Sequence, residues 1–249
     1  MRVQRLGRRL TLAIVILSSA LATGVMSTQA SGSDQPAADR AKSGGVALVS
    51  RSTTSPVRVD SQVITEADFR EQVQIVQSNV AFMHEEIAAK SLNAAYLQKF
   101  ITIINAHGVA NVALASLIEN RSVYLLAVAR GYQPSQAEVT ARVEEDRGLA
   151  ASGKAPAETK AFITAVGEQY YWATLDPEVV RRALAIQAFH ASVIQNSPDM
   201  DGQVAAWQKI EQQAVAATRI EVLDSDAIAP ATPDAALAYL RAYWAFQGS

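Results

Sequence analysis

The sequence predicts a mainly α-helical domain with one small sheet, and three observations support this fold class. Glycine and proline number only 12 and 8 in 249 residues, while alanine is abundant, which favours helix over a loop-rich β fold. Apolar residues recur at intervals of three and four over most of the chain. Residues 57–64 and 217–223 instead alternate apolar and polar side chains, as strands do, and are expected to pair in the small sheet.

The first thirty residues have the pattern of an export signal. Four arginines precede an apolar run at residues 10–25, and the small-x-small sequence Thr28-Gln29-Ala30 follows it. The run is short for a membrane-spanning helix, so we expect a cleaved signal peptide at residues 1–30, with an uncleaved anchor as the alternative. Cleavage would change the formal net charge from −2 to −6 and place the mature chain outside the cytoplasmic membrane, periplasmic or secreted.

The mature chain begins with a segment that resembles a linker. Residues 31–56 are rich in serine, glycine, alanine, aspartate and lysine, and are expected to form a flexible tether. The stretch VRVDSQVI at residues 57–64 then predicts a strand and a turn. A lone strand is not stable, and its evident partner is the distant segment at residues 217–223. The alternative is that both stretches are ordered coil.

A long helix is predicted to begin after Thr65, whose spacing to Asp68 is that of an N-cap pair. Its apolar residues recur at alternating steps of four and three, forming one seam: Phe69, Val73, Val76, Val80, Met83 and Ile87. Such a seam packs against other helices, either within the chain or in a coiled coil with a second chain. We favour packing within the chain.

Two helices are predicted on either side of Gly108. Aromatic and branched apolar residues over 96–104 mark the first of them, which is expected to end near this glycine. The second is expected over residues 110–130, where apolar side chains again recur at helical spacing and predict one buried face.

The most informative stretch is residues 117–146, LIENRSVYLLAVARGYQPSQAEVTARVEED, which reads as two helices joined by a tight break. Gly131 stands where a helix end favours a positive φ, and Pro134 prevents the helix from continuing. Ser135 and Glu138 have the spacing of a capping box. A new helix is therefore predicted over residues 136–147.

The next segment predicts a loop at residues 148–156 and a short helix over 157–166. Asp176, Pro177 and Glu178 then predict a further helix start, with an N-cap acid, a proline in the first turn and an acid near the positive end of the helix dipole.

A last helix in the body, marked by apolar residues over 204–215, leads into the strand at 217–223. We therefore assign residues 57–223 to one helical domain and residues 224–249 to a linker and a C-terminal amphipathic helix over 233–246. This helix has three alternative positions: on the body, on a partner, or on a membrane surface.

Composition excludes several function classes. The chain has no cysteine, which excludes disulfides, zinc-thiolate sites and thiol catalysis. Its 22 basic and 24 acidic residues are nearly balanced, whereas a nucleic-acid binder needs a basic face. We therefore expect no nucleic-acid partner.

No motif predicts a catalytic, cofactor-binding or metal site. The three histidines, His84, His107 and His190, fall on different predicted helices, and the sequence after His84 lacks the second histidine of an H-E-x-x-H zinc motif. The acidic run at residues 144–146 is typical of a solvated helix end rather than a metal cluster. No G-x-S-x-G, S-x-x-K or P-loop sequence occurs. The adjacent aromatics Tyr170, Tyr171 and Trp172 fit either core packing, which we favour, or a groove for apolar peptide segments.

Three segments, in this order and spacing, resemble the N-terminal chaperone domain of the SurA and PrsA-type foldases. They are VDSQVITEADFREQVQ, LIENRSVYLLAVARGYQPSQAEVTARVEED and AWQKIEQQAVAATRIEVL, and together they span residues 57–223. Tyr132 stands where an aliphatic residue is commoner in the family. The resemblance implies a mostly helical domain whose first and last segments pair, and which holds unfolded exported polypeptides.

Relatives usually also carry a parvulin prolyl-isomerase domain, and here the resemblance stops. The region between residues 147 and 199 is too short for one, reads as helical and lacks the family's glycine motif. The expected function is therefore that of an exported, non-catalytic chaperone-like protein that needs no cofactor and binds unfolded polypeptide segments through residues that the sequence does not identify. The alternatives are a structural or assembly subunit with one specific envelope partner, and a peptidyl-prolyl isomerase of unrecognised type.

Overall fold

The computed structural model describes residues 55–90, 93–155, 159–160, 163–164, 167–195, 197 and 199–248, and the structural statements below concern these residues. The predicted signal peptide, nearly all of the tether and part of the short helix predicted over 157–166 lie outside them. Helices dominate, and one small three-stranded antiparallel sheet accompanies them. The predicted fold class is therefore confirmed.

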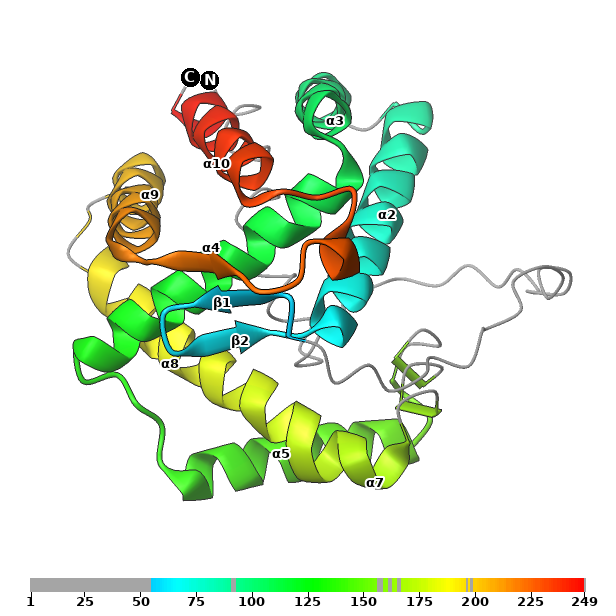
Figure 1. Ribbon diagram of the computed structural model, residues 1–249, viewed down its shortest axis with the longest axis vertical. Coiled ribbons are helices and arrows are strands. Elements are labelled where there is room, and N and C mark those ends of the chain that lie inside the picture. The colour runs from blue at the N-terminus through cyan, green and yellow to red at the C-terminus, as the bar shows by residue number, and fades with distance from the viewer. Residues whose placement is uncertain are drawn as a thin grey trace, which may run out of the picture.

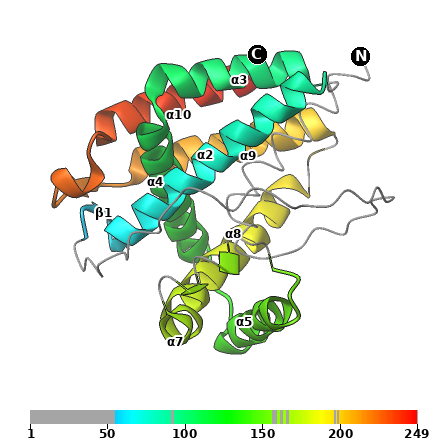
Figure 2. The same ribbon diagram turned by 90° about the vertical axis from the view of Figure 1, so that its right-hand side faces the viewer.

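The elements follow one another in this order: β1 (Val57–Val59), β2 (Gln62–Ile64), α2 (Glu66–Ala88), α3 (Ala94–His107), α4 (Val109–Ala129), α5 (Gln136–Ala151), α7 (Glu168–Tyr170), the π-helical turn η1 (Tyr171–Leu175), α8 (Asp176–Ile194), α9 (Met200–Ala217), β3 (Ile220–Val222), the 3₁₀ turn η2 (Asp226–Ile228) and α10 (Pro233–Gln247). Helix α4 is central: α2, α8, α9 and α10 all pack against it. Figures 1 and 2 show α5 and α7 at the end of the molecule opposite α3 and α10.

The sheet joins the two ends of the domain, as the alternating patterns predict. β1 lies between β2 and β3 and runs antiparallel to both, with Val57 opposite Ile64 on one side and Val222 on the other (Figure 1). Val57 and Val59 are completely buried and contact the core around α4. The residues that follow the turn form a second strand, β2, which pairs with β1. The early segment is therefore a hairpin rather than a single strand and a turn.

The seam on α2 packs within the chain, as expected. Phe69, Val76 and Met83 are buried in the main core, and the intervening seam residues pack against it. The C-terminal helix α10 docks on the body, against α3 and α4, which decides among its three alternative positions. Tyr239 and Leu240 of α10 lie in the same core as the α2 seam because α10 presents its apolar face to α4.

Local signals at the helix ends are confirmed in detail. The Thr65 hydroxyl accepts from the Asp68 N–H at 3.0 Å, and the Asp68 carboxylate accepts from the Thr65 N–H at 2.9 Å. Ser135 and Glu138 make the same reciprocal pair at the start of α5. Gly131 has φ +88°, a conformation that costs a residue with a Cβ atom but not a glycine.

The predicted N-cap role of Asp176 is wrong. Its backbone is already helical, with φ −59° and ψ −45°, because α7 and η1 run into α8 without a break. The Asp176 side chain is buried instead, near Tyr171, and neither of its carboxylate oxygens has a hydrogen-bond partner among the described residues. Pro177 does stand in the first turn of α8, as predicted.

Helix α4 is long and apolar enough to cross a membrane by length and composition. Its buried residues lie on every side of the helix, where α2, α8, α9 and α10 cover it. Its position as the core helix of the domain therefore accounts for its apolar character.

Candidate functional site

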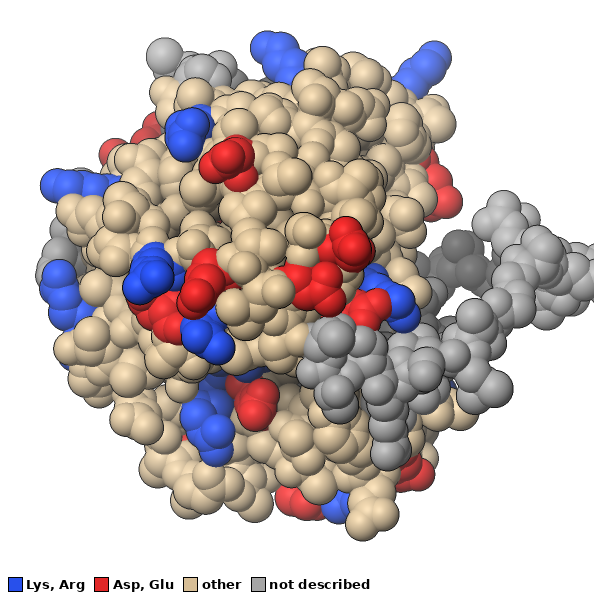
Figure 3. Space-filling view, in the orientation of Figure 1, with Lys and Arg blue, Asp and Glu red and all other residues tan. Residues whose placement is uncertain are grey.

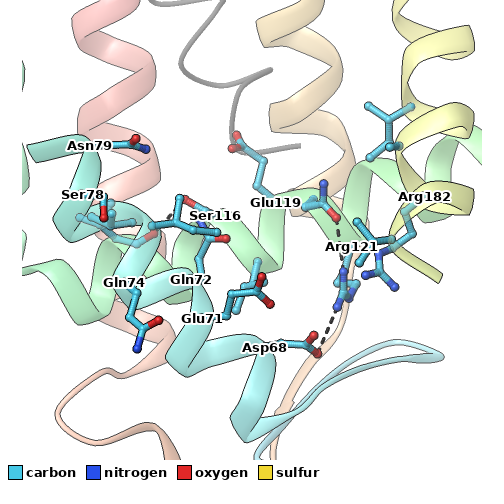
Figure 4. Close-up of a pocket in the computed structure, with 18 of the residues that line it drawn as sticks. Asp68, Glu71, Gln72, Gln74, Ser78, Asn79, Ser116, Glu119, Arg121 and Arg182 are labelled. Carbon is cyan, nitrogen blue, oxygen red and sulfur yellow. Dashed lines mark hydrogen bonds and ion pairs between the residues drawn. The ribbon is translucent and has the colours of Figure 1, made fainter. Parts of the chain in front are cut away.

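A cavity of about 860 Å³ lies between α2 and α8, where α4 forms the wall that connects them. It is partly open to solvent, and its inner end reaches Trp207 of α9 and Tyr239 and Tyr243 of α10. Figure 4 shows polar and charged side chains from α2, α4 and α8 directed into this space. A volume of this size lies within the usual range for ligand-binding sites, about 300–1,000 Å³.

The α2 wall of the cavity is a second stripe on this helix, beside the buried seam. Residues at steps of three and four share one face of a helix, so a stripe parallel to the seam faces α8 across the gap. This stripe is mixed in character and consists of Asp68, Glu71, Gln72, Ile75, Asn79 and Phe82.

The α8 wall is built by the same rule and is also mixed. Its lining residues recur at helical steps from the first turns of α8 to its last: Val179, Arg182, Ala183, Ile186, Gln187 and His190. Since both helices pack on α4, the distance between their facing stripes is set by α4 and not by contact between the stripes.

One end of the cavity is charged. Arg121 of α4 is 3% exposed, and its Nη2 lies 3.3 Å from the Asp68 Oδ2, while its Nη1 donates to the Asn120 Oδ1 at 3.4 Å. The Arg121 Nε is buried, and among the described residues it has no hydrogen-bond partner. A buried donor without a partner costs free energy, so a ligand group that accepts from it would stabilise this end of the cavity.

Arg182 of α8 lies near Arg121 at the same end. Burial, and then the positive charge of Arg121, lower the pKa of Arg182 to about 10, so it is still charged at neutral pH. Its Nη1 approaches the Glu178 Oε2 only to 3.9 Å, beyond hydrogen-bond distance. Burial and the charge of Asp68 raise the pKa of Glu71, on the α2 side, to about 7, although Arg182 partly opposes this shift.

The other end holds two carboxyl groups among aromatic side chains. Glu119 of α4 accepts a hydrogen bond from the Trp244 Nε1 at 3.2 Å, and burial raises its pKa to about 7. Glu211 of α9 is 4% exposed, and burial together with the charge of Glu119 raises its pKa well above the ordinary range, although Trp207 donates to it. Both groups therefore favour the protonated, uncharged form more than a solvent-exposed glutamate does.

Between the two ends the lining combines apolar surface with amides. The apolar part includes Ile75, Phe82, Met83, Leu117, Val179 and Ile186. In the described part of the chain, the side chains of five lining amides make no hydrogen bond to protein: Gln72, Gln74, Gln77, Asn79 and Gln187. Such a surface can bury apolar side chains of a ligand and offers donors and acceptors to its polar groups.

Most residues that the sequence singled out lie elsewhere or play structural roles. Trp172 is buried in a small core with Tyr171, whose ring also reaches the cavity, while Tyr170 is 46% exposed. The acidic run at 144–146 is paired with neighbouring arginines, and the described residues contain no group of three or more metal-ligating side chains. His190 alone of the three histidines lines the cavity.

The residues that form the cavity were missed by the sequence analysis. A signal for them existed on α2, where polar residues at helical spacing run parallel to the apolar seam. Such a stripe is also what solvent exposure produces, so the pattern does not distinguish a cavity wall from an ordinary wet face.

Comparisons with protein-family models, with curated proteins and with solved structures found no match.

Proposed function

We propose that this chain is an exported, non-catalytic chaperone-like protein that binds unfolded or partly folded polypeptide segments in the cavity between α2 and α8. The observation that carries the proposal is the mixed lining of this cavity, in which apolar side chains alternate with amides that make no hydrogen bond to protein in the described structure. An unfolded segment offers the matching chemistry, since it exposes apolar side chains next to unpaired backbone N–H and C=O groups.

The physical basis of such binding is hydrophobic and tolerant of sequence. Burial of apolar surface contributes about 25 cal/mol per Å² and has no directional preference. Phe82 is 53% exposed although it is a large apolar residue, and it lies on the cavity stripe of α2. Flexible glutamine and asparagine side chains can bond to the backbone of many different segments, so no cofactor or nucleotide is required.

The sequence patterns support the same proposal. The segments resembling the SurA and PrsA-type foldases include the paired strands and α2, which carries the cavity stripe. The basic and apolar residues before Ala30 support an extracytoplasmic location, where exported chains are unfolded when they arrive. Acidic and basic side chains are interspersed on the face in Figure 3, which does not resemble the basic surface of a nucleic-acid binder.

A dedicated assembly subunit would bind its partner through an apolar face, for which the α2 seam and the C-terminal helix are the candidates. Both are packed against the rest of the domain, so neither offers an apolar face to a partner. No observation favours the isomerase alternative.

The test is aggregation of an unrelated, chemically denatured protein, followed by light scattering with and without the purified chain. We expect the wild type to slow aggregation and Phe82→Ser to lose most of this effect, because the substitution removes exposed apolar surface from the cavity. Leu223→Ser is the matched control, since Leu223 is 44% exposed and lies outside the cavity lining.

Equal losses in the two variants would mean that general surface hydrophobicity, not the cavity, is responsible. No effect of the wild type on aggregation, together with no binding of apolar peptides in calorimetry, would overturn the proposal. A proline-peptide isomerisation rate above background would favour the enzyme alternative instead.

A further inference from the structure

The charged end of the cavity contains two guanidinium groups whose hydrogen-bond donors the protein itself does not fully use. Figure 4 shows Arg121 and Arg182 on the same side of the cavity, with Asp68 and Glu71 reaching towards them from α2. The Arg121 side chain is 4% exposed and that of Arg182 is 12% exposed, so water screens their charges weakly.

The bonding of the two arginines is unequal. Arg121 has one carboxylate partner, Asp68, at 3.3 Å, and a buried Nε without a hydrogen-bond partner among the described residues. Arg182 has no hydrogen bond to a described residue, and its nearest carboxylate, that of Glu178, lies at 3.9 Å on a side chain that is 60% exposed. A guanidinium carries five donors, so most of the donors of Arg182 remain available to a group in the cavity.

The remaining acid at this end, Glu71, makes no hydrogen bond to either arginine in the described structure. Glu71 faces the arginines, but burial and Asp68 raise its pKa to about 7, so close to half of it is protonated at neutral pH. The ionised partners of the pair are then Asp68 and the solvent-exposed Glu178. A ligand carboxylate near Arg182 would supply the hydrogen-bond acceptor that this guanidinium lacks and could bond to it in the bidentate geometry that favours this pair.

We propose that Arg182, with Arg121 beside it, forms a carboxylate-binding subsite, so that the cavity prefers polypeptide segments that carry an aspartate or glutamate side chain or a free C-terminus. This inference rests on the proposed function and specifies the class of segment that is bound. The rest of the lining holds the apolar part of the segment, and the subsite fixes its position along the cavity.

The test uses three N-acetylated peptides of leucine, phenylalanine and alanine, with binding measured by calorimetry. The first carries a central aspartate and an amidated end, the second an asparagine in its place, and the third the asparagine with a free carboxyl end. For the wild type we expect the aspartate peptide, the free-carboxyl peptide or both to bind more tightly than the neutral peptide. The expected difference is about tenfold in affinity, which is the effect of one charge-assisted hydrogen bond. Comparison of the first and third peptides distinguishes the two sources of the carboxylate.

Arg182→Gln should abolish this preference, so that the aspartate, free-carboxyl and neutral peptides bind this variant with similar affinity. Arg181→Gln is the matched control, because Arg181 is the next residue of α8, lies outside the cavity lining and donates to the Gln136 Oε1 at 3.0 Å. This control should keep the preference of the wild type.

Equal binding of all three peptides to the wild type would overturn the subsite and leave peptide binding intact. An equal loss for charged and neutral peptides in Arg182→Gln would also overturn it, because a structural role alone predicts that result. Absence of binding by every peptide would overturn the proposed function together with the subsite. The comparison of peptides on the wild type does not depend on whether a variant folds.

Discussion

Helices α4 and α5 are neighbours in the chain, yet the fold holds them in different ways. α4 packs against α2, α8, α9 and α10, and its buried side chains lie all around the helix. α5 packs against α8, and its buried side chains are Val139 and Val143. The helix with the better N-terminal cap is therefore the less buried one. A capping motif decides where a helix begins, whereas packing provides most of the stability of a helix.

The two helices also belong to different cores. α4 lies in a large core with the sheet, α2, α3 and α10. α5 lies in a small core that also includes Ile163, Tyr171, Trp172 and Val180. Helix α8 contributes both to this small core and to the cavity wall. We therefore expect the α8 wall of the cavity to open at a lower free energy than the α2 wall.

The largest effect is expected from Leu114→Ala in α4, where the side chain is completely buried. The void that the smaller alanine side chain leaves in the core should lower the free energy of unfolding by about 3 kcal/mol. Val139→Ala in α5, also at a completely buried site, should cost about 1.5 kcal/mol, because two methyl groups are removed. Urea unfolding measures both values, and a larger loss for Val139→Ala would contradict the comparison.

Hydrogen exchange on the same two variants tests where the stability is lost. Leu114→Ala should increase exchange throughout the described domain, while Val139→Ala should increase it mainly in α5 and η1. Uniform exchange in both variants would mean that the two cores unfold as one unit.

An intermediate effect is expected from two of the buried acids with a pKa of about 7, Glu119 beside α10 and Asp176 beside Tyr171. Burial is the main cause of both shifts, so the folded protein binds more protons than the unfolded chain between about pH 4.5 and 7. The contribution of these two groups therefore lowers the free energy of unfolding as the pH rises through this window.

Glu119→Gln removes this proton uptake and keeps an oxygen that can accept from Trp244. Between pH 4.5 and pH 8 we expect the wild type to lose about 1–2 kcal/mol more than Glu119→Gln. Asp176→Asn should reduce the pH dependence in the same direction, and denaturant midpoints across the pH range measure both. A steeper fall with pH in either variant would contradict the assigned cause.

The smallest effect is expected at the two capping boxes. Ser135→Ala and Thr65→Ala each remove a hydroxyl that accepts a backbone N–H at the first turn, which typically costs about 1 kcal/mol. Thr65→Ala should cost more than Ser135→Ala because its box partner, Asp68, also holds Arg121. Thermal unfolding measures both, and a larger cost at Ser135 would indicate that α5 matters more to the domain than its burial suggests.

Much of the fold could be predicted from the sequence because its signals are local. Helix starts at Thr65 and Ser135 follow from the groups that satisfy unpaired backbone N–H donors, and the turn at Gly131 follows from a conformation that disfavours a Cβ atom. Pairing of residues 57–59 with 220–222 could be inferred because each strand lacked another partner. The wrong prediction at Asp176 is informative, since the chain continues as a helix through this residue from η1 into α8 and its side chain is buried instead of capping a helix start.

The cavity could not be predicted in the same way. Arg182 and Arg121 are far apart in the sequence, and each alone reads as a solvated charge on a helix. They become neighbours because α8 packs against α4.

The sequence by itself determined the helical class, the ends of several helices and the strands that close the domain, because backbone hydrogen bonding and side-chain periodicity act over a few residues. Only the tertiary structure decided that α10 covers the core, that the α2 seam is internal, and that the mixed stripes of α2 and α8 face each other. These outcomes depend on which faces meet when α4 is buried, and that is a property of the packing of many helices at once.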